Sequence, residues 1–209
     1  MVAVKLDQVS LKSIKLGPVE AMYGGSGHKA KFLPKMEIVL PSQRVPWKIE
    51  AKAWQGSGEA SAKAAIAVTD ATLRALLDKV DKVARAGLEK HIEEFYPDAR
   101  KRPLANLLPS MFNGAVQESG DYEPVFKAKL KVDDKTIVTP LFHMETKELL
   151  DPNAMLEKGA MVTLVVTPLH VYAMTNGVGV TWGVVRMGLD GFAGAETPTF
   201  DFGVQSQAE

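Results

Sequence analysis

A single long helix is the strongest structural signal in the sequence. Apolar residues recur every three or four positions through residues 69–96, TDATLRALLDKVDKVARAGLEKHIEEFY, which places them on one face of an amphipathic helix. Thr69 or Asp70 can cap its start, and Pro97 ends it. Gly87 costs about 1 kcal/mol relative to alanine, which a buried stripe of this length outweighs. The charged face is interpreted as solvent-exposed surface.

Short alternating segments stand on both sides of this helix and predict strands. Residues 9–53 hold several of them, each bounded by glycine or proline as in a β-meander, and a phase slip near Ser13 predicts a β-bulge. Residues 97–123 hold three prolines and two glycines and are predicted to be a long connection. Strands return over residues 124–189, where Asn176-Gly177 is typical of a tight hairpin turn.

This order of strands, one helix and strands predicts a mainly β fold. A five-stranded antiparallel Greek-key barrel of the oligonucleotide/oligosaccharide-binding type (OB-fold), with one long inserted helix and extensions, fits the order. A β-sandwich carrying one helix is the alternative. Residues 1–190 are expected to form this domain. Residues 191–209 are expected to be a flexible acidic tail, because they carry too little apolar surface to order themselves.

Charge is distributed unevenly along a chain whose formal net charge is zero. Residues 1–48 hold eight lysines and arginines against three acids, whereas four acids and no base follow Arg186. A basic N-terminal part and an acidic C-terminal part are typical of a nucleic-acid-binding protein with a solvated tail. The chain has no cysteine and no apolar run long enough to span a membrane, which favours a cytoplasmic location.

The glycine-rich segment 22–32, MYGGSGHKAKF, is not a nucleotide-binding P-loop. That motif needs two glycines five positions apart and a hydroxyl after its lysine, whereas Gly24 and Gly27 are three apart and Ala30 follows Lys29. The segment is either a flexible hairpin tip or a basic flap that closes over phosphates.

No motif in the sequence supports catalysis or a metal site. The chain has four histidines, at positions without the spacing of a local ligand pair. The H-x-E fragments at His91 and His143 lack the cysteines with which zinc deaminases hold their metal. No G-x-S-x-G occurs, and Asp133-Asp134 is interpreted as a hairpin turn. We therefore expect a non-enzymatic protein without a cofactor or metal.

Basic residues provide the candidate binding site. In the segment 125–132, VFKAKLKV, alternation places Lys127, Lys129 and Lys131 on one strand face, about 7 Å apart. This row is either a solvated outer face or a contact for the phosphates of an extended single strand. The cations predicted to contact nucleic acid are Lys29, Lys31, Lys35, Lys48, Arg100, Lys101, Arg102, Lys127, Lys129 and Lys131.

Aromatic side chains would complete a site for single strands, because stacking operates on every base. Phe32, Trp47, Trp54 and Tyr172 are predicted to stack on bases. Trp182 shares a strand face with valines and is assigned to the core.

The C-terminal half, EKGAMVTLVVTPLHVYAMTNGVGVTWGVVRMGL, resembles the closing strands of the single-stranded DNA-binding proteins of tailed phages and large eukaryotic DNA viruses. The matching features are Lys158-Gly159 at the start of a strand, Val171-Tyr172 within it, the glycine hairpin 176–179, and Trp182 in the last strand. The resemblance covers residues 124–190 and, in layout only, the first half.

This resemblance implies sequence-tolerant coating of single-stranded DNA during replication or recombination, in the cytoplasm of a host cell. Phage members often carry a dense acidic tail ending in an aromatic residue, which docks on replication proteins. Here the tail has only Glu196, Asp201 and Glu209, with Phe200 and Phe202 before its end. Docking by the tail is therefore an expectation that rests on the sign of its charge, and a homodimer is left open. The alternative function is a virion structural or assembly protein built on a β-sandwich.

Overall fold

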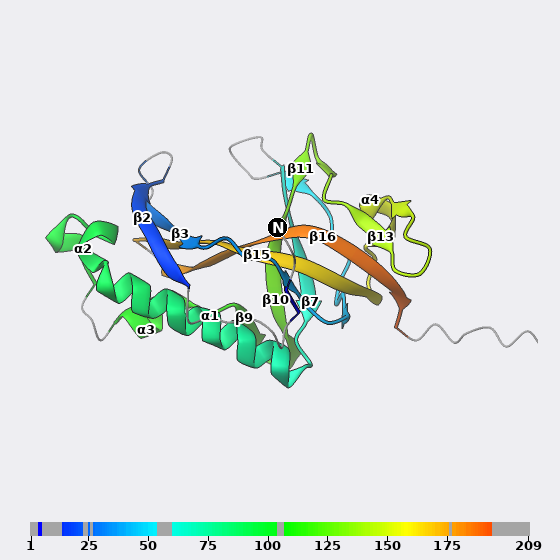
Figure 1. The fold of residues 1–209 in the computed structure, drawn as a ribbon, viewed down its shortest axis with the longest axis horizontal. Helices are drawn as coiled ribbons and strands as arrows, with labels where there is room; N and C mark the ends of the chain where they lie inside the picture. Colours follow the sequence, from blue (N-terminus) through cyan, green and yellow to red (C-terminus); the bar gives the residue numbers. More distant parts are fainter. Residues whose placement is uncertain are drawn as a thin grey trace, which may run out of the picture.

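Two long antiparallel strands dominate the fold. The computed structural model describes residues 4–5, 14–22, 25, 27–53, 60–103, 107–175 and 177–193. Strands β15 (Ala160–Met174) and β16 (Gly177–Phe192) pair from end to end. Their register shifts at three places, the last of them between Pro168 and His170. Because each shift is a bulge that bends and twists the ladder, the pair is curved (Figure 1).

Longer strands extend the sheet on both sides of this pair. On one side β3 (Gly27–Leu33) pairs with β15 and with β2 (Lys15–Ala21), antiparallel in both cases. On the other side β10 (Tyr122–Leu130) runs parallel to β16 and antiparallel to β7 (Ala60–Ala67). The order across this part of the sheet is therefore β2–β3–β15–β16–β10–β7.

Short strands and helices complete the described chain. The short strands are β1 (Val4–Lys5), β4 (Ile38–Val39), β5 (Gln43–Arg44), β6 (Lys52–Ala53), β8 (Phe112–Asn113), β9 (Val116–Ser119), β11 (Val132–Asp133), β12 (Thr136–Ile137), β13 (Leu141–His143) and β14 (Leu149–Leu150). The short helical turns are α2 (Ile92–Phe95), η3 (Ala99–Lys101), α3 (Leu108–Met111) and α4 (Pro152–Met155).

The predicted long helix is confirmed, with one break near its end. Helix α1 spans Ala71–Lys90, and a turn at His91 separates it from α2. Asp70 caps the start, since its Oδ1 accepts a hydrogen bond from the Leu73 amide at 2.8 Å. Gly87 has a packing reason that its helix propensity does not reveal: a Cβ there would lie 2.6 Å from Cδ1 of Leu16 on β2.

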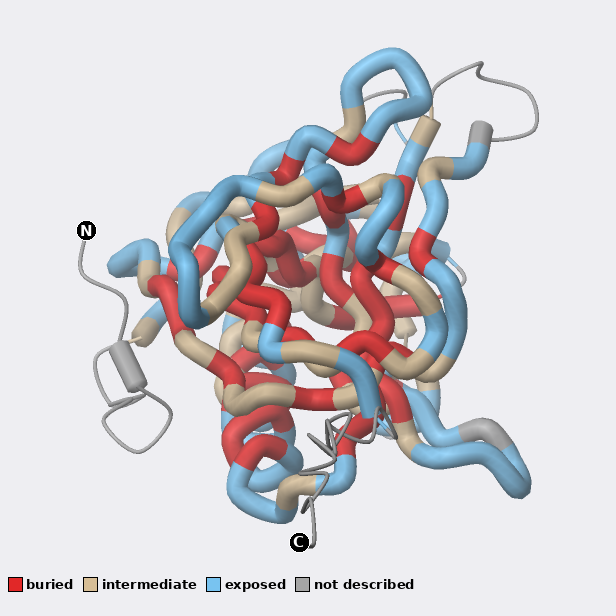
Figure 2. The backbone as a smooth tube through the Cα atoms, turned by 90° about the vertical axis from the view of Figure 1, so that its right-hand side faces the viewer, coloured by how far each residue is buried: buried red, intermediate tan, exposed pale blue. Residues whose placement is uncertain are grey.

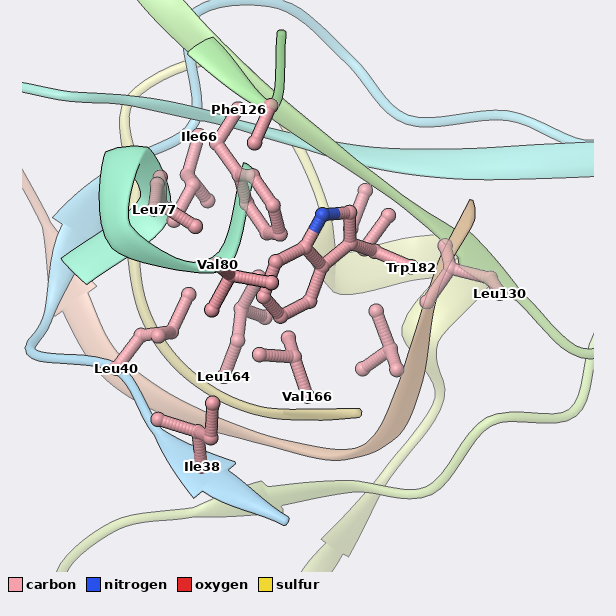
Figure 3. Packing of buried hydrophobic residues seen from close by; sticks show 14 of the residues in the cluster. Ile38, Leu40, Ile66, Leu77, Val80, Phe126, Leu130, Leu164, Val166 and Trp182 are labelled. Atoms are coloured by element: carbon pink, nitrogen blue, oxygen red, sulfur yellow. The ribbon is translucent and has the colours of Figure 1, made fainter. Parts of the chain in front are cut away.

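The core lies between α1 and the inner face of the curved strands. Leu77 and Val80 of α1 pack with Phe126 of β10, Trp182 of β16 and Leu164 of β15 (Figure 3). The rings of Phe126 and Trp182 meet edge to face, with centroids 5.3 Å apart. Figure 2 shows the buried residues gathered inside the wrapped strands. The prediction that Trp182 belongs to the core is confirmed, because it is 3% exposed.

The mainly β class is confirmed, whereas the five-stranded antiparallel Greek-key barrel is not. The sheet is mixed, since β10, β13 and β8 all run parallel to β16. Within the described part of the chain, the strand path from β1 to β6 is open rather than closed into a barrel.

The connection predicted over residues 97–123 is largely structured. It contains η3, α3, β8 and the β9 strand that pairs with β10. The bulge expected near Ser13 lies outside the described residues, although the β2–β3 register does shift between Leu16 and Val19. The predicted acidic tail also lies outside them from residue 194 onward, as does Asn176 of the predicted turn between β15 and β16.

Candidate nucleic-acid interface

The sheet face opposite α1 carries basic and aromatic side chains. On β3, Ala30 and Phe32 point into the core, so the alternating Lys29 and Lys31 point outward. On β15, His170 stands opposite Lys31 and Tyr172 stands opposite Lys29. Because directly paired residues share a sheet face, these four side chains form one group on the outer surface. Figure 1 shows α1 running along the other side of β3, β15 and β16.

Small residues on β16 continue this surface. Gly179 pairs with Tyr172, and Thr181 pairs with His170. The Tyr172 side chain lies against Gly179, where a Cβ would come within 2.9 Å of its hydroxyl oxygen. Asn113 Nδ2 donates a weak hydrogen bond of 3.4 Å to that oxygen. The Tyr172 ring is therefore held on the surface of β16.

The lysine row of β10 lies on the same surface. Phe126, Ala128 and Leu130 are buried, which confirms the alternation that directs Lys127 and Lys129 outward. Lys129 is in register with Gly183 of β16 on one side and with Lys63 of β7 on the other. Lys131 follows the end of β10 and is exposed.

Three of these lysines converge on His170. Burial lowers the pKa of the half-buried imidazole, and the charges of Lys129, Lys29 and Lys31 lower it further, to about 4. The imidazole is therefore neutral at physiological pH. Strands β3 and β10, about a hundred residues apart in sequence, thus both carry lysines whose charges act on His170. We call Lys29, Lys31, Lys129 and His170 the β3–β10 cluster.

Trp47 provides an exposed ring beside the lysine row. It is 44% exposed, and the ammonium nitrogen of Lys127 lies 5.6 Å from the centre of its ring. This cation–π contact joins the loop after β5 to β10. Trp47 is therefore a surface residue, as stacking on a base requires.

The prediction that Phe32 stacks on a base is wrong. It is 3% exposed and belongs to the core, so its ring offers no free face to a base. The physical reason is strand alternation: the glycine-rich segment continues as β3, and Phe32 falls on the inward phase. Lys29 and Lys31 therefore stand on a regular strand rather than in the loop tip.

Other predicted cations already have acidic partners. Lys48 lies 2.8 Å from Glu157 and 3.7 Å from Glu50, and the Glu157 contact raises the pKa of Lys48. Arg102 pairs with Glu93 at 3.0 Å, and Arg100 contacts Asp98 at 3.5 Å.

The remaining predicted site residues are either exposed or lie outside the described residues. Lys35 and Lys101 are exposed, and Trp54 lies outside the described residues. Among residues that the structure describes, no hydrogen bond or ion pair joins residues 100–102 to the β3–β10 cluster. Arg102 Nε donates a hydrogen bond to the Tyr96 carbonyl, and the Tyr96 hydroxyl donates one to the Met174 carbonyl at the end of β15. A role of the Arg100–Arg102 segment in binding stays a prediction.

Sequence reasoning missed His170, Lys63 and Thr181 as members of this surface. No motif in the sequence singles out His170. The available signal was its spacing of two residues from Tyr172, which places both on one strand face.

Two further observations bound the chemistry of the described residues. They contain no group of three or more histidine or acidic side chains arranged to hold a metal ion. In the same part of the chain, no helix combines the length and the apolar character needed to cross a lipid bilayer.

Comparison with known proteins gives structural but not sequence matches. No protein-family model and no curated protein matches the sequence. The structure of gp2.5, a single-stranded DNA-binding protein encoded by bacteriophage T7, aligns with a TM-score of 0.53 at 14% identity, over 75% of this chain and 92% of that chain. The single-stranded DNA-binding protein from bacteriophage Enc34, solved in complex with single-stranded DNA, aligns with a TM-score of 0.48 at 17% identity, over 84% and 95%.

At these identities the likeness concerns the fold. The T7 protein is a phage single-stranded DNA-binding protein, the kind of protein that residues 124–190 resemble. The chain shares the fold of the T7 protein over most of that protein's length.

Proposed function

We propose that this protein binds single-stranded DNA without regard to sequence, in the replication or recombination of a phage or viral genome. The observation that carries the proposal is the β3–β10 cluster, in which Lys29, Lys31 and Lys129 surround His170 on an exposed sheet face. Binding requires no chemistry on the DNA. The fold shared with the T7 protein supports the same function.

Phosphate neutralisation supplies the affinity. In the described residues, no ion pair involves Lys29, Lys31, Lys127 or Lys129, so these ammonium groups are available to phosphates. Each contact releases condensed counterions, and the logarithm of the affinity falls by roughly 0.7 per phosphate contact for each decade of salt.

An exposed ring and a partly buried ring supply the preference for unpaired bases. Trp47 and Tyr172 stand on the same outer surface as the lysines, and both can stack on a base of any kind. Bases in a duplex are already stacked and paired, so they cannot use these rings without strand separation. From β3 to β10 the surface spans three interstrand spacings, about 14 Å, across which a strand can pass from Lys31 to Lys129.

Three further elements of the function remain proposals. The tip of the β2–β3 hairpin acts as a flap beside the bound strand. Residues 1–190 act as the DNA-binding domain, and residues 191–209 act as an acidic tail that meets replication proteins in the host cytoplasm. Lys35, Trp54, Lys101 and Lys131 extend the contact with DNA.

A fluorescence titration tests the proposal directly. Oligo-dT is added to the full chain, tryptophan emission is recorded at two salt concentrations, and the titration is repeated with duplex DNA of equal length. The proposal expects quenching by oligo-dT, an affinity that falls steeply with salt, and weaker binding of the duplex. Equal affinity for the duplex, or no binding of oligo-dT at low salt, contradicts it.

A further inference from the structure

We propose that His170 takes up a proton when single-stranded DNA binds, and so becomes a fourth cation of the β3–β10 cluster in the complex. The inference rests on the proposed function and adds to it a named residue and a dependence of affinity on pH.

The surroundings of His170 contain cations on two sides and no acid in direct register. From β3 it faces Lys31, with Lys29 two residues further along that strand. Lys129 of β10 is in register with Gly183, two residues from Thr181 on β16, and its charge acts on the imidazole. Its partner on β16 is the uncharged Thr181, flanked on that face by glycines. Further titratable groups on this face, among the described residues, include Lys127 of β10, Lys63 of β7, Tyr172 of β15, Glu20 of β2 in register with Lys29, and Lys15 of β2 in register with Leu33.

This arrangement opposes protonation in the free protein. Partial burial disfavours the imidazolium first, and the three lysines add electrostatic repulsion. With a pKa of about 4, His170 stays uncharged above pH 5.

A bound phosphate reverses the electrostatic part of this balance. It brings negative charge to the lysines whose repulsion holds the imidazole neutral, and it offers an acceptor to a ring N–H. An opposite charge within about 4–6 Å favours the charged form of a titratable group. The pKa of His170 therefore rises on binding, even though burial of the ring persists.

The sign of the pH effect follows from proton binding. Between pH 4 and the higher pKa of the complex, the complex holds more protons at His170 than the free protein does. Affinity then increases as pH falls through this interval and becomes independent of pH above it. Between pH 7.5 and pH 5.5 we expect binding to tighten about three- to tenfold.

The experiment measures the affinity for fluorescein-labelled dT₁₂ by anisotropy at fixed ionic strength between pH 5.5 and pH 8. Three full-length proteins are compared: the wild type, His170→Gln, and the matched control His91→Gln. His91 lies at the junction of α1 and α2, with its Nδ1 2.8 Å from Glu94, and not on the outer sheet face. The control therefore removes an imidazole from another place in the fold.

We expect the pH dependence to persist in the wild type and in His91→Gln and to disappear in His170→Gln. An NMR titration of the His170 ring, with and without dT₁₂, should show its pKa rising in the complex. Binding whose pH dependence survives His170→Gln, or a ring pKa that DNA leaves unchanged, overturns the inference while the proposed function stands. Failure of the wild type to bind dT₁₂ at any pH removes the proposed function and the inference with it.

Discussion

Lys127 lies over the indole of Trp47, with its ammonium nitrogen 5.6 Å from the ring centre. The contact fixes an otherwise exposed ring against the lysine row of β10, at a gain of about 0.5–1 kcal/mol for an exposed pair. It places a cation for a phosphate and a ring for a base next to each other. This is the combination that a sequence-tolerant single-strand site needs.

Trp47 should report DNA binding. Of the three tryptophans, Trp182 is sealed in the core and Trp54 lies outside the described residues. Stacking of a base on the exposed indole quenches its emission, so Trp47→Phe should lose a large part of the quenching by oligo-dT. Trp182→Phe should keep it. The proposed site beside Trp47 is contradicted if oligo-dT still quenches the emission of Trp47→Phe but no longer quenches that of Trp182→Phe.

Lys31 should contribute to the salt dependence of binding. It stands on the exposed phase of β3 opposite His170. Lys31→Gln removes one phosphate contact, so the slope of log affinity against log salt should become shallower by roughly 0.7. The measurement is a series of oligo-dT titrations at four or more salt concentrations.

Lys79→Gln provides the matched control for this charge change. Lys79 is exposed on α1, the helix on the opposite side of the sheet. Its loss should leave the slope unchanged. If the two variants change the slope equally, the lysines act only through net charge and the proposed surface is wrong.

The affinity for oligo-dT should fall much more in Tyr172→Leu than in Phe32→Leu. Tyr172→Leu removes an outward ring, and the loss of one base stack costs about 1–3 kcal/mol, a five- to 150-fold weaker affinity. Phe32→Leu repacks a core position and should cost about 1 kcal/mol of stability while affinity changes little. Oligo-dT titration and thermal melting of both variants separate the two effects. Weaker binding of Phe32→Leu than of Tyr172→Leu would restore Phe32 as a stacking residue.

The sequence predicts the features that depend on the spacing of residues within a single segment. Helix α1, its Asp70 cap, the outward phase of Lys127 and Lys129, and the buried Trp182 all follow from spacing along one segment. Register between distant segments cannot be obtained in this way. The meeting of Lys31, His170 and Lys129 depends on which strands pair and on the bulge after Pro168.

Two features of the site depend on partners that only the fold supplies. Phe32 belongs to strand β3, which begins at Gly27, and the pairing of β3 with β15 decides which side chains face inward. Glu157, more than a hundred residues from Lys48 in sequence, lies 2.8 Å from it. The contact of Lys48 with DNA stays a prediction.

Asp81 should make stability fall as pH rises. It is 4% exposed on α1, its Oδ2 accepts a hydrogen bond from the Ala115 amide at 2.7 Å, and burial raises its pKa to about 6. The Ala115 hydrogen bond and Arg85 oppose this rise, and Asp78 adds to it. Asp81→Asn keeps an acceptor for Ala115 and removes the buried charge. At pH 7 it should be more stable than the wild type by about 2–3 kcal/mol.

The pH window of this effect follows from the two pKa values. Between about pH 4 and pH 6 the folded state holds a proton on Asp81 that the unfolded state has released. The wild type therefore loses stability relative to Asp81→Asn as pH rises through this interval, and the difference is constant above it. His170 acts in the opposite direction, because its lowered pKa makes stability fall as pH drops below about 6.5.

The difference in the free energy of unfolding between the wild type and Asp81→Asn is therefore measured, by urea unfolding at pH 4, 5, 6 and 7. Glu89→Gln, an exposed position on the same helix, should change stability by no more than about 0.5 kcal/mol at any of these pH values. An Asp81→Asn variant that is less stable than the wild type at pH 7 would mean that the carboxylate is stabilised where it lies. The hydrogen bond from Ala115 would then outweigh the burial of the charge.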